Sequence, residues 1–354
     1  MTKADILIIG GGLTGLTLAY LFKHTDLKVA VVEARNRLGG RILTVGGHGQ
    51  ATVEMGATWL GPAHTKLQFL LDELGLNTFQ QRLGGKAIYE PTSMSPHQLV
   101  TLPVQQQPSF RIEGGTSALI TTLKGHLKDV DLFLDEPVNK ITSEKNKVIV
   151  ESSDITFEAG VVVSTLPPKL LSESIKFDPE LPKNVSELLA TTHTWMGESI
   201  KFGLIFDDPF WLEEDSSGTV FSNVGPINEM YDHSTRNDNQ HAIKGFLNGS
   251  YFSVSKEERL QMILKQLSKY YGNQVNDYTE YHELVWANEP FTYFPYDKHV
   301  LPHQNNGHAI FQRTYLNNKF IIAGAETAEN SPGYMDGAVH SAFHVYDQII
   351  KMKE

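Results

Sequence analysis

The sequence predicts an α/β fold of two domains, and three observations lead to that prediction. The chain has 354 residues, 40% of them hydrophobic, which is enough to bury two cores rather than one. Two short apolar runs, 5–9 and 28–33, flank a segment with helical apolar periodicity over 13–23, which predicts two buried strands joined by a helix. Later segments alternate between apolar and other residues, which predicts a second, mixed β-sheet.

The remaining elements follow from periodicity and from the residues that end them. Apolar periodicity predicts four further helices, over 65–76, 114–129, 255–271 and about 336–352. Glycine at position 75 is placed to end the first of these. The segment 78–110 is weakly patterned, and we expect it to form loops with short strands.

Apolar runs also predict a β-meander and a late strand. The meander is expected to contain 132–135, 147–151 and 155–164, with a tight turn over 144–147. Two prolines follow its last strand and end it, because proline cannot donate to the strand ladder. The late strand is expected over 320–324.

A regular alternation marks the strand expected over 198–206. Side chains of successive strand residues point to opposite faces of a sheet. One face is predicted to carry Ile200, Phe202, Leu204 and Phe206, and the opposite face Lys201, Gly203 and Ile205.

Composition excludes several classes of function. A formal net charge of −11 and a pI near 5.7 argue against binding to nucleic acid, which requires clustered Lys and Arg. The chain has no cysteine, so it has no disulfide and no thiol nucleophile. We expect a cytoplasmic protein with no membrane span, because no segment approaches about 18 consecutive apolar residues. No cluster has the spacing of a metal site, so no metal is expected.

The glycine-rich turn after the first strand predicts a dinucleotide site. The segment 10–15, GGGLTG, fits G-x-G-x-x-G between a strand and a helix, where the backbone can approach a pyrophosphate at the helix N-terminus. Glu33 is the last residue of the second strand, where a carboxylate can accept hydrogen bonds from ribose hydroxyls. The strand–helix–strand unit is therefore Rossmann-like, and the turn alone leaves NAD and FAD open.

The continuation of this turn resembles one family. EARNRLGGRI (33–42) is similar to the corresponding segment of flavin-containing amine oxidases, the monoamine and polyamine oxidase family. The resemblance continues in family order along the whole chain, through EMGATWLGP (54–62), RIEGGTSAL (111–119), EPV (136–138), STLPP (164–168), SIKFGLIFDDPFW (199–211) and AGAETAENSPGYMDGAV (323–339).

The resemblance implies FAD as the cofactor and assigns residues to it. The expected cofactor-binding residues are Gly10, Gly12, Leu13, Thr14, Gly15, Glu33, Ala34, Arg35, Gly40, Arg41, Gly56, Ala57, Thr58, Val138, Gly324, Glu326, Gly333, Tyr334, Met335 and Ala338. Alignment puts Glu289 where monoamine oxidases carry the cysteine that links the flavin, so the FAD is expected to be non-covalent. A helix that begins after Gly333 would place its positive end near the reduced flavin.

The resemblance also implies the residues of the reaction. Lys201 matches the strand lysine that reaches toward flavin N5 through a water, and Tyr334 matches one wall of an aromatic cage. Pro290 takes the position of the opposite wall, so the candidates for that wall are Trp286, Phe291 and Tyr293.

A deletion separates this chain from the family pattern. Only a short segment lies between Gly75 and Gly114, where family members carry a helical subdomain that covers the substrate cavity. We expect a discontinuous FAD-binding domain (1–77, 111–190 and 306–354) and a smaller substrate-binding domain (78–110 and 191–305).

The implied function is oxidation of an amine to an imine, which hydrolyses to an aldehyde. Molecular oxygen would be the acceptor and hydrogen peroxide the product. The alternatives are a flavin-dependent desaturase or dehydrogenase of the same superfamily, and a flavoprotein of low activity that binds a partner. The segment 56–64 has no arginine to bind a substrate carboxylate, which favours a simple amine, although Arg82 or Arg111 could serve. A homo-oligomer is compatible with the sequence.

Overall fold

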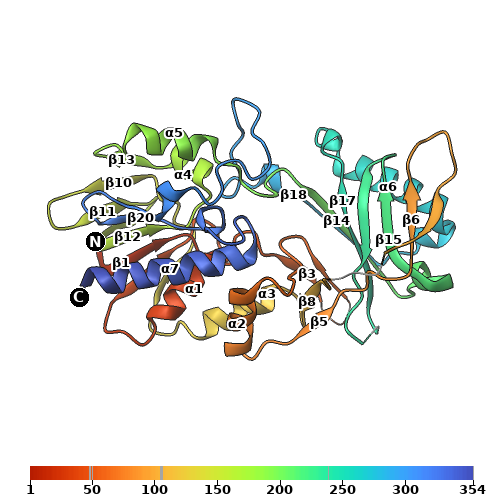
Figure 1. Ribbon diagram of the computed structural model, residues 1–354, viewed down its shortest axis with the longest axis horizontal. Helices are drawn as coiled ribbons and strands as arrows, with labels where there is room; N and C mark the ends of the chain where they lie inside the picture. Colours follow the sequence, from red (N-terminus) through yellow and green to blue (C-terminus); the bar gives the residue numbers. More distant parts are fainter. Residues whose placement is uncertain (48, 50, 104–106, 238, 354) are drawn as a thin grey trace.

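Two β-sheets at opposite ends of the long axis organise the chain (Figure 1). The computed structural model describes residues 1–354 except 48, 50, 104–106, 238 and 354. Both termini lie beside the larger sheet, which has nine strands, and the seven-stranded sheet occupies the other end. This arrangement matches the predicted α/β class with a second, smaller sheet.

The centre of the first sheet is parallel. Strand β1 (Thr2–Ile9) lies between β2 (Val29–Val32) and β12 (Thr156–Ser164), and all three run in the same direction. Strands β9 (Asp131–Phe133) and β20 (Phe320–Ile322) extend the parallel part on either side. The carboxyl ends of these five strands therefore meet along one edge, where open α/β sheets bind their ligands.

The meander differs from the prediction in one strand. Strands β10 (Lys140–Ser143) and β11 (Val148–Glu151) pair antiparallel, and β11 pairs with β12. The turn at 144–147 forms as predicted, with the Glu144 N–H donating to the Lys147 carbonyl at 2.9 Å. The placement of 132–135 in this meander was wrong. Strand β9 follows a helix and pairs parallel with β2 on the far side of β1, which is the usual result of a helical crossover.

Short strands complete the first sheet and connect it to the second. Strand β13 (Lys176–Asp178) pairs with β10, and β19 (Thr314–Tyr315) pairs with β20. Two small hairpin-like sheets lie between the large ones, and they are formed by β3 (Thr44–Gly46) with β4 (Thr52–Glu54) and β5 (Thr78–Gln80) with β8 (Phe110–Ile112).

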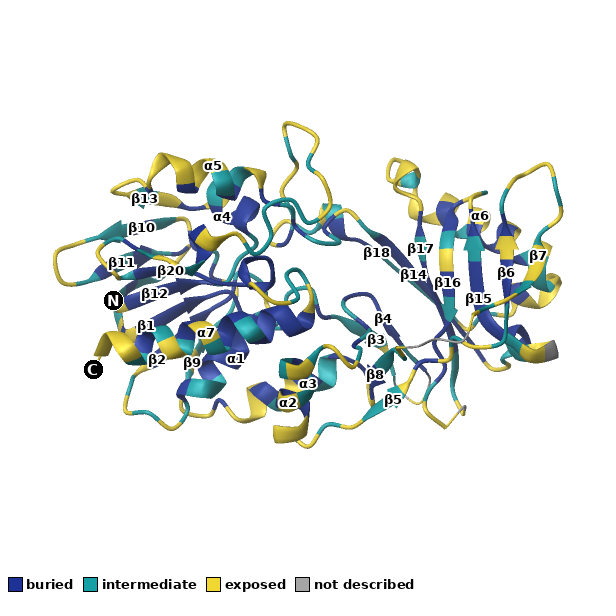
Figure 2. Ribbon diagram, viewed as in Figure 1, coloured by how far each residue is buried: buried dark blue, intermediate teal, exposed yellow. Residues whose placement is uncertain are grey.

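Helices cover both faces of the first sheet. On one face, Ile6 and Ile8 pack against helices α1 (Leu13–Phe22) and α7 (Met335–Lys353). Helices α2 (Thr65–Glu73) and α3 (Ser117–Gly125) join the same core. The opposite face packs against α4 (Pro168–Ser174) and α5 (Lys183–Thr191). Figure 2 shows the central strands buried and the outer surfaces of α2 and α5 exposed.

The second sheet has the order β18-β14-β17-β16-β15-β6-β7. Its strands are β6 (Lys86–Glu90), β7 (Gln98–Thr101), β14 (Ile200–Phe206), β15 (Ser216–Ser222), β16 (Ile227–Asp232), β17 (His241–Leu247) and β18 (Glu280–Val285). Helix α6 (Lys256–Tyr271) covers one face and begins with a capping box between Ser255 and Glu258. The alternation predicted for β14 is confirmed, because Ile200, Phe202, Leu204 and Phe206 share the core under α6 while Ile205 packs on the other face.

The segment between α2 and α3 contains no helix among its described residues. It forms β5, β6, β7 and β8 instead, and two of these strands extend the second sheet. The face of that sheet opposite α6 therefore carries no helical layer from this part of the chain.

Within the described ranges, every helix is too short or too polar to span a lipid bilayer.

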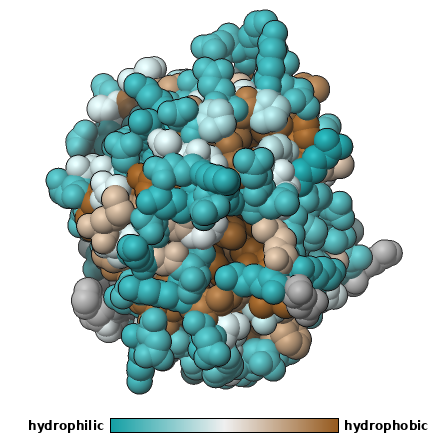
Figure 3. Space-filling view, turned by 90° about the vertical axis from the view of Figure 1, so that its left-hand side faces the viewer, coloured by the Kyte–Doolittle hydropathy of each residue, from teal (hydrophilic) through white to brown (hydrophobic). Residues whose placement is uncertain are grey.

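The surface at the end that carries the first sheet is mainly hydrophilic. Figure 3 looks at this end and shows hydrophobic residues gathered in recesses between polar side chains. This is the pattern expected where helices and charged strand ends cover a buried parallel sheet.

Gly15 is the residue whose replacement should disturb this fold most directly. A Cβ at this position would lie 2.0 Å from the Gly10 carbonyl oxygen, so α1 could no longer pack against the end of β1. We expect Gly15→Ala to lower the free energy of unfolding by about 3 kcal/mol, the upper range for overpacking, and to abolish binding of the dinucleotide that the glycine-rich turn is expected to hold. Gly125→Ala, at the end of α3 where a Cβ meets no atom within 4 Å, is the matched control. Urea unfolding followed by circular dichroism measures both; equal stability of the two variants would contradict the packing argument.

Candidate functional site

A cavity of about 630 Å³ runs from the carboxyl edge of the first sheet to the second sheet. Its volume lies within the range of small-molecule and cofactor sites. Most of the sequence-predicted residues line it, namely Gly10, Gly12, Leu13, Thr14, Glu33, Ala34, Arg35, Gly40, Arg41, Ala57, Thr58, Val138, Lys201, Trp286, Phe291, Gly333, Tyr334, Met335 and Ala338. Gly15, Gly56, Gly324, Glu326 and Tyr293 lie outside this lining.

The N-terminus of α1 presents backbone donors to the cavity. Gly12 is the N-cap and offers no side chain, so the first N–H groups of the helix have no side-chain acceptor. Leu13 and Thr14, in the first turn, line the cavity. Free donors and the positive end of the helix dipole suit a pyrophosphate, so this end of the cavity fits a dinucleotide.

Glu33 is held rigidly at the end of β2. Its two carboxylate oxygens accept hydrogen bonds from the N–H groups of Gly11, at 2.7 Å, and Arg35, at 3.0 Å. This fixes the carboxylate at the strand end, where it can accept from ribose hydroxyls as the sequence predicts.

Arg35 connects this end of the cavity to a segment more than 250 residues away in sequence. Its guanidinium donates to the Glu289 carboxylate at 3.1 Å, to the Thr292 hydroxyl at 2.8 Å and to the Phe291 carbonyl at 3.2 Å. The 289–292 segment, where the sequence analysis placed the linking position, is therefore bound beside Glu33.

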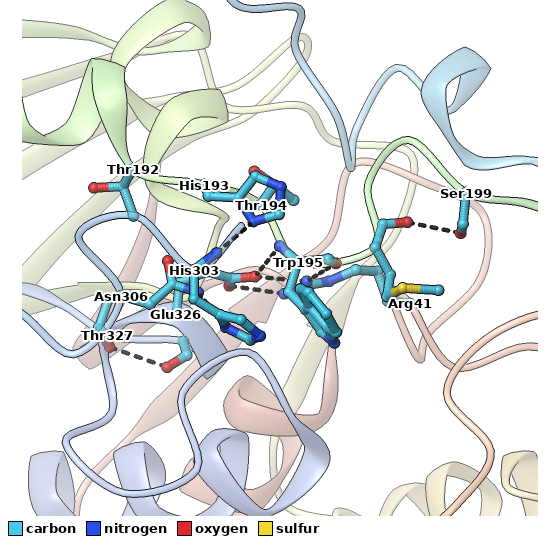
Figure 4. Close-up of polar contacts among 12 residues, drawn as sticks. Arg41, Thr192, His193, Thr194, Trp195, Ser199, His303, Asn306, Glu326 and Thr327 are labelled. Carbon is cyan, nitrogen blue, oxygen red and sulfur yellow. Dashed lines mark hydrogen bonds and ion pairs between the residues drawn. The ribbon is translucent and has the colours of Figure 1, made fainter. Parts of the chain in front are cut away.

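An ion pair joins Arg41, which lines the cavity and is partly exposed, to the buried Glu326. Arg41 donates to both carboxylate oxygens of Glu326, at 2.6 and 2.8 Å, and also to the Trp195 carbonyl at 2.9 Å (Figure 4). The Trp195 N–H donates to Glu326 at 3.2 Å. Glu326 is almost fully buried, so it acts on the cavity through Arg41 rather than by lining it.

Lys201 reaches the cavity from the second sheet. Its side chain lies on the face of β14 that is opposite the α6 core, and its Nζ donates to the Gly56 carbonyl at 2.7 Å. Burial lowers the pKa of Lys201 to about 7, Glu54 opposes this shift, and the charge of Arg41 adds to it. Near neutral pH, the Lys201 side chain can therefore be either a neutral amine or an ammonium.

Tyr334 precedes the first residue of α7 and is partly exposed to the cavity. Among the described residues, its ring contacts are with Trp195, His303 and His64, with centroids 5.7, 5.7 and 5.9 Å away. Trp195 also stacks on His303 at 3.9 Å. Trp195 lines the cavity and was missed by the sequence analysis, although its place six residues before Lys201 could have drawn attention to it.

The three candidates for the second aromatic wall lie in different places. Trp286 lines the cavity, and its Nε1 donates to the Met55 carbonyl at 2.7 Å. Phe291 lines it beside Arg35. Tyr293 does not line the cavity, and its hydroxyl donates to the Glu198 carboxylate. Within the described part of the chain, none of the three has a recorded ring contact with Tyr334.

The N-terminus of α7 faces the same cavity. Met335 and Ala338, in its first turn, line the wall beside Gly333. Asp336 points away from the cavity and binds the Leu67 N–H at 2.9 Å and the Ser331 hydroxyl at 2.9 Å. The cavity therefore offers two helix N-termini, those of α1 and α7, to a flavin dinucleotide. No cluster of metal-ligating side chains occurs in the described ranges.

Comparisons with known proteins identify the family. The family model of flavin containing amine oxidoreductase matches residues 13–101 and 92–350. The chain is 26% identical to the probable flavin-containing monoamine oxidase A of Dictyostelium discoideum, over 98% of each chain, and 25% identical to the putrescine oxidase of Kocuria rosea, over 82% and 83%. A solved structure of putrescine oxidase bound to putrescine has the same fold, with a TM-score of 0.84, 23% identity and 99% coverage of both chains.

The comparisons also bear on the missing helical subdomain. The alignment with the Dictyostelium relative extends over 456 positions although this chain has 354 residues, so the relative carries residues without counterparts here. The two stretches of this chain that match the family model overlap at residues 92–101, between α2 and α3. The chain belongs to the family of flavin-containing amine oxidoreductases, as a compact member, and is an amine-oxidising enzyme with FAD as its cofactor.

Proposed function

We propose that this enzyme oxidises a simple amine at the carbon that bears nitrogen, with molecular oxygen as the final acceptor and hydrogen peroxide as the product. The imine formed first would hydrolyse to an aldehyde. The single observation that carries this proposal is Lys201, a buried lysine whose Nζ lies in the wall of the cavity that also holds the expected FAD residues. When bound, FAD supplies the acceptor for the two electrons of the amine carbon–hydrogen bond.

We further propose that the FAD is held without a covalent bond. Glu289 occupies the place of the linking cysteine, and its carboxylate forms an ion pair with Arg35 at 3.1 Å. The chain has no cysteine that could form a thioether. Retention of the cofactor would then depend on the α1 N-terminus, Glu33 and the Arg41–Glu326 pair.

The substrate is proposed to lack a carboxylate near the reacting carbon. Arg82 and Arg111, the two candidates for a carboxylate contact, both lie outside the cavity lining. Arg111 is buried and donates to the Ser234 carbonyl, and Arg82 lies 3.5 Å from Asp232. Neither guanidinium is therefore available to a substrate at Lys201 without rearrangement.

A second amino group on the substrate would find a carboxylate on the sheet. Lys201 pairs with Phe246 on β17, and Phe246 pairs with Glu229 on β16. These three residues form one row on the same face. Two strand spacings separate the backbone of Glu229 from the backbone of Lys201, a distance of about 10 Å. Glu229 is exposed, and Phe221 is its partner on β15. We propose that a diamine is a better substrate than a monoamine of similar size.

The site gives less support to the two alternatives that the sequence left open. A desaturase or dehydrogenase acting on carbon–carbon bonds has no evident use for the lysine and tyrosine at this wall. A partner-binding flavoprotein of low activity is supported by the uncovered sheet face alone. Anaerobic bleaching of the flavin by amines separates both alternatives from amine oxidation.

Lys201→Met tests the reaction role. The variant keeps a side chain of similar length without the amine, so we expect bound flavin to be retained and one half-reaction to slow by at least tenfold. Stopped-flow absorbance measures flavin reduction by amine and reoxidation by oxygen separately. Unchanged rates for both half-reactions would remove Lys201 from the mechanism.

The same variant tests the buried charge through stability. Because the pKa of Lys201 is near 7 in the folded protein, the unfolded chain binds more protons between that pH and the ordinary lysine value of 10.5. The wild-type protein should therefore gain stability as pH rises above 7, and the advantage of Lys201→Met should be largest below pH 7 and shrink above it. Urea unfolding over this pH range measures the difference. If the difference in free energy of unfolding between the two proteins is the same at every pH, the pKa of Lys201 is not lowered in the folded protein.

Glu229→Gln tests the substrate class. Loss of the carboxylate should raise the KM for a diamine such as putrescine by at least fivefold and leave the KM for a monoamine such as butylamine within a factor of two. Hydrogen peroxide formation with both amines gives the comparison. An equal change for the two amines would exclude a role in binding the distal ammonium.

A further inference from the structure

A second fully buried lysine, Lys244, stands beside Lys201 on the neighbouring strand. Strand pairing puts Lys244 opposite Gly203, so its side chain leaves β17 on the same face as Lys201. The residue is 0% exposed, and its Nζ is hydrogen-bonded to the hydroxyl of Thr58. The rings of Trp59 and Phe246 flank the Nζ, with centroids 4.6 and 5.5 Å away.

A hydrogen-bonded path joins the two lysines. Lys201 Nζ donates to the Gly56 carbonyl at 2.7 Å, and the Thr58 hydroxyl lies 3.2 Å from the same oxygen. The Thr58 hydroxyl donates to that oxygen and accepts a hydrogen bond from Lys244 Nζ. Thr58 lines the cavity whereas Lys244 does not, so the hydroxyl is the link between the cavity and Lys244.

The charges around Lys244 come from several elements. Lys201 on β14, Arg111 on β8 and His233 after β16 face it with basic groups, Glu54 on β4 is the carboxylate, and Tyr231 is its partner on β16. Burial lowers the pKa of Lys244 well below its ordinary value, the charges of Lys201 and Arg111 lower it further, and Glu54 opposes them.

Glu54 is the group that can stabilise a proton on Lys244. It is buried, and its carboxyl accepts from the Thr116 N–H at 2.7 Å and from the Thr44 hydroxyl at 2.9 Å. The two aromatic faces add cation–π attraction for an ammonium. Burial and the neighbouring basic groups thus disfavour a proton on Lys244, while Glu54 and the two aromatic faces compensate part of the charge once a proton arrives.

We propose that Lys244, acting through the Thr58 hydroxyl, is the base that removes the proton from a bound substrate ammonium. This inference rests on the proposed amine oxidation, because an alkylamine is protonated in neutral water and only the neutral amine has the lone pair needed for oxidation. For this step the Thr58 hydroxyl turns its proton from the Gly56 carbonyl to the lone pair of the neutral Lys244 Nζ. The ammonium N–H proton then passes to Thr58 Oγ1, and the Thr58 hydroxyl proton passes to Lys244 Nζ. The substrate becomes a neutral amine, Lys244 becomes an ammonium, and the total charge is unchanged.

The test uses an amine that binds and cannot react. 2-Phenylpropan-2-amine has no hydrogen on the carbon that bears nitrogen, so it cannot be oxidised. The FAD-loaded protein is labelled with 13C at lysine Cε, and the Lys244 resonance is assigned by its loss in Lys244→Met. At neutral pH we expect this resonance to report a neutral amine without ligand and to move to the ammonium position when the ligand binds.

Thr58 variants separate the relay from a general effect of binding. Thr58→Val should abolish the shift of the Lys244 resonance while the ligand still perturbs the flavin absorbance, and Thr58→Ser should restore the shift. Lys169→Met is the control, since Lys169 is another buried lysine, paired with Glu173 at 2.6 Å on α4. That control should keep the full shift at Lys244. If Lys244→Met does not fold, the spectrum of Lys201→Met identifies the Lys201 resonance. The other resonance with a lowered pKa is then assigned to Lys244.

Three results would overturn the proposal: a Lys244 that is already an ammonium without ligand, a resonance that does not move on binding, and a full shift in Thr58→Val. Failure of the ligand to perturb the flavin would instead overturn the proposed amine site, and this inference with it.

A kinetic measurement adds a second readout. Lys244→Met should reduce flavin at least tenfold more slowly at neutral pH and recover at a pH where the free substrate is a neutral amine.

Discussion

The ion pair between Arg41 and Glu326 is the interaction on which the arrangement of the site depends. It joins the segment after the dinucleotide turn to the segment before α7, and Trp195 binds both partners through its backbone. Three parts of the chain that are distant in sequence therefore meet at one carboxylate. Removal of one member of a buried pair leaves the other uncompensated, at a cost of about 3–5 kcal/mol.

A different balance holds around Glu54, beside the second sheet, where three basic groups face one carboxyl. Lys201, Lys244 and Arg111 surround Glu54, and the pKa of Glu54 is itself raised by burial. Such an arrangement does not stabilise the fold, because the buried amines and the buried carboxyl each lose hydration. Buried groups with displaced pKa values at a cavity wall are typical of reaction sites, and here the cost is consistent with a role in moving protons.

The parts of the site that the sequence could predict are those that depend on residues close together in the chain. The glycine turn, Glu33 and the alternation around Lys201 each depend on residues close together in the chain, and the structure brings them to one cavity. The strand at 131–133 was misplaced because its own residues do not specify a partner, which is chosen by the crossover through α3. Lys244 was missed because an isolated lysine in an alternating strand is usually exposed, and only the pairing of β17 with β14 shows that both faces are covered.

The segment that takes the place of a helical layer gives two strands to the second sheet. The face opposite α6 is buried at Lys201 and Lys244 but exposed further along the sheet, at Glu229. Beyond Glu229 this face continues through Phe221 to Tyr89, which is exposed. The trailing end of a long molecule can therefore remain in water while its terminal nitrogen lies at Lys201. Under the proposed function, the length of the substrate would then carry no penalty of dehydration, and an amino group at the tip of a chain larger than the cavity could reach the site.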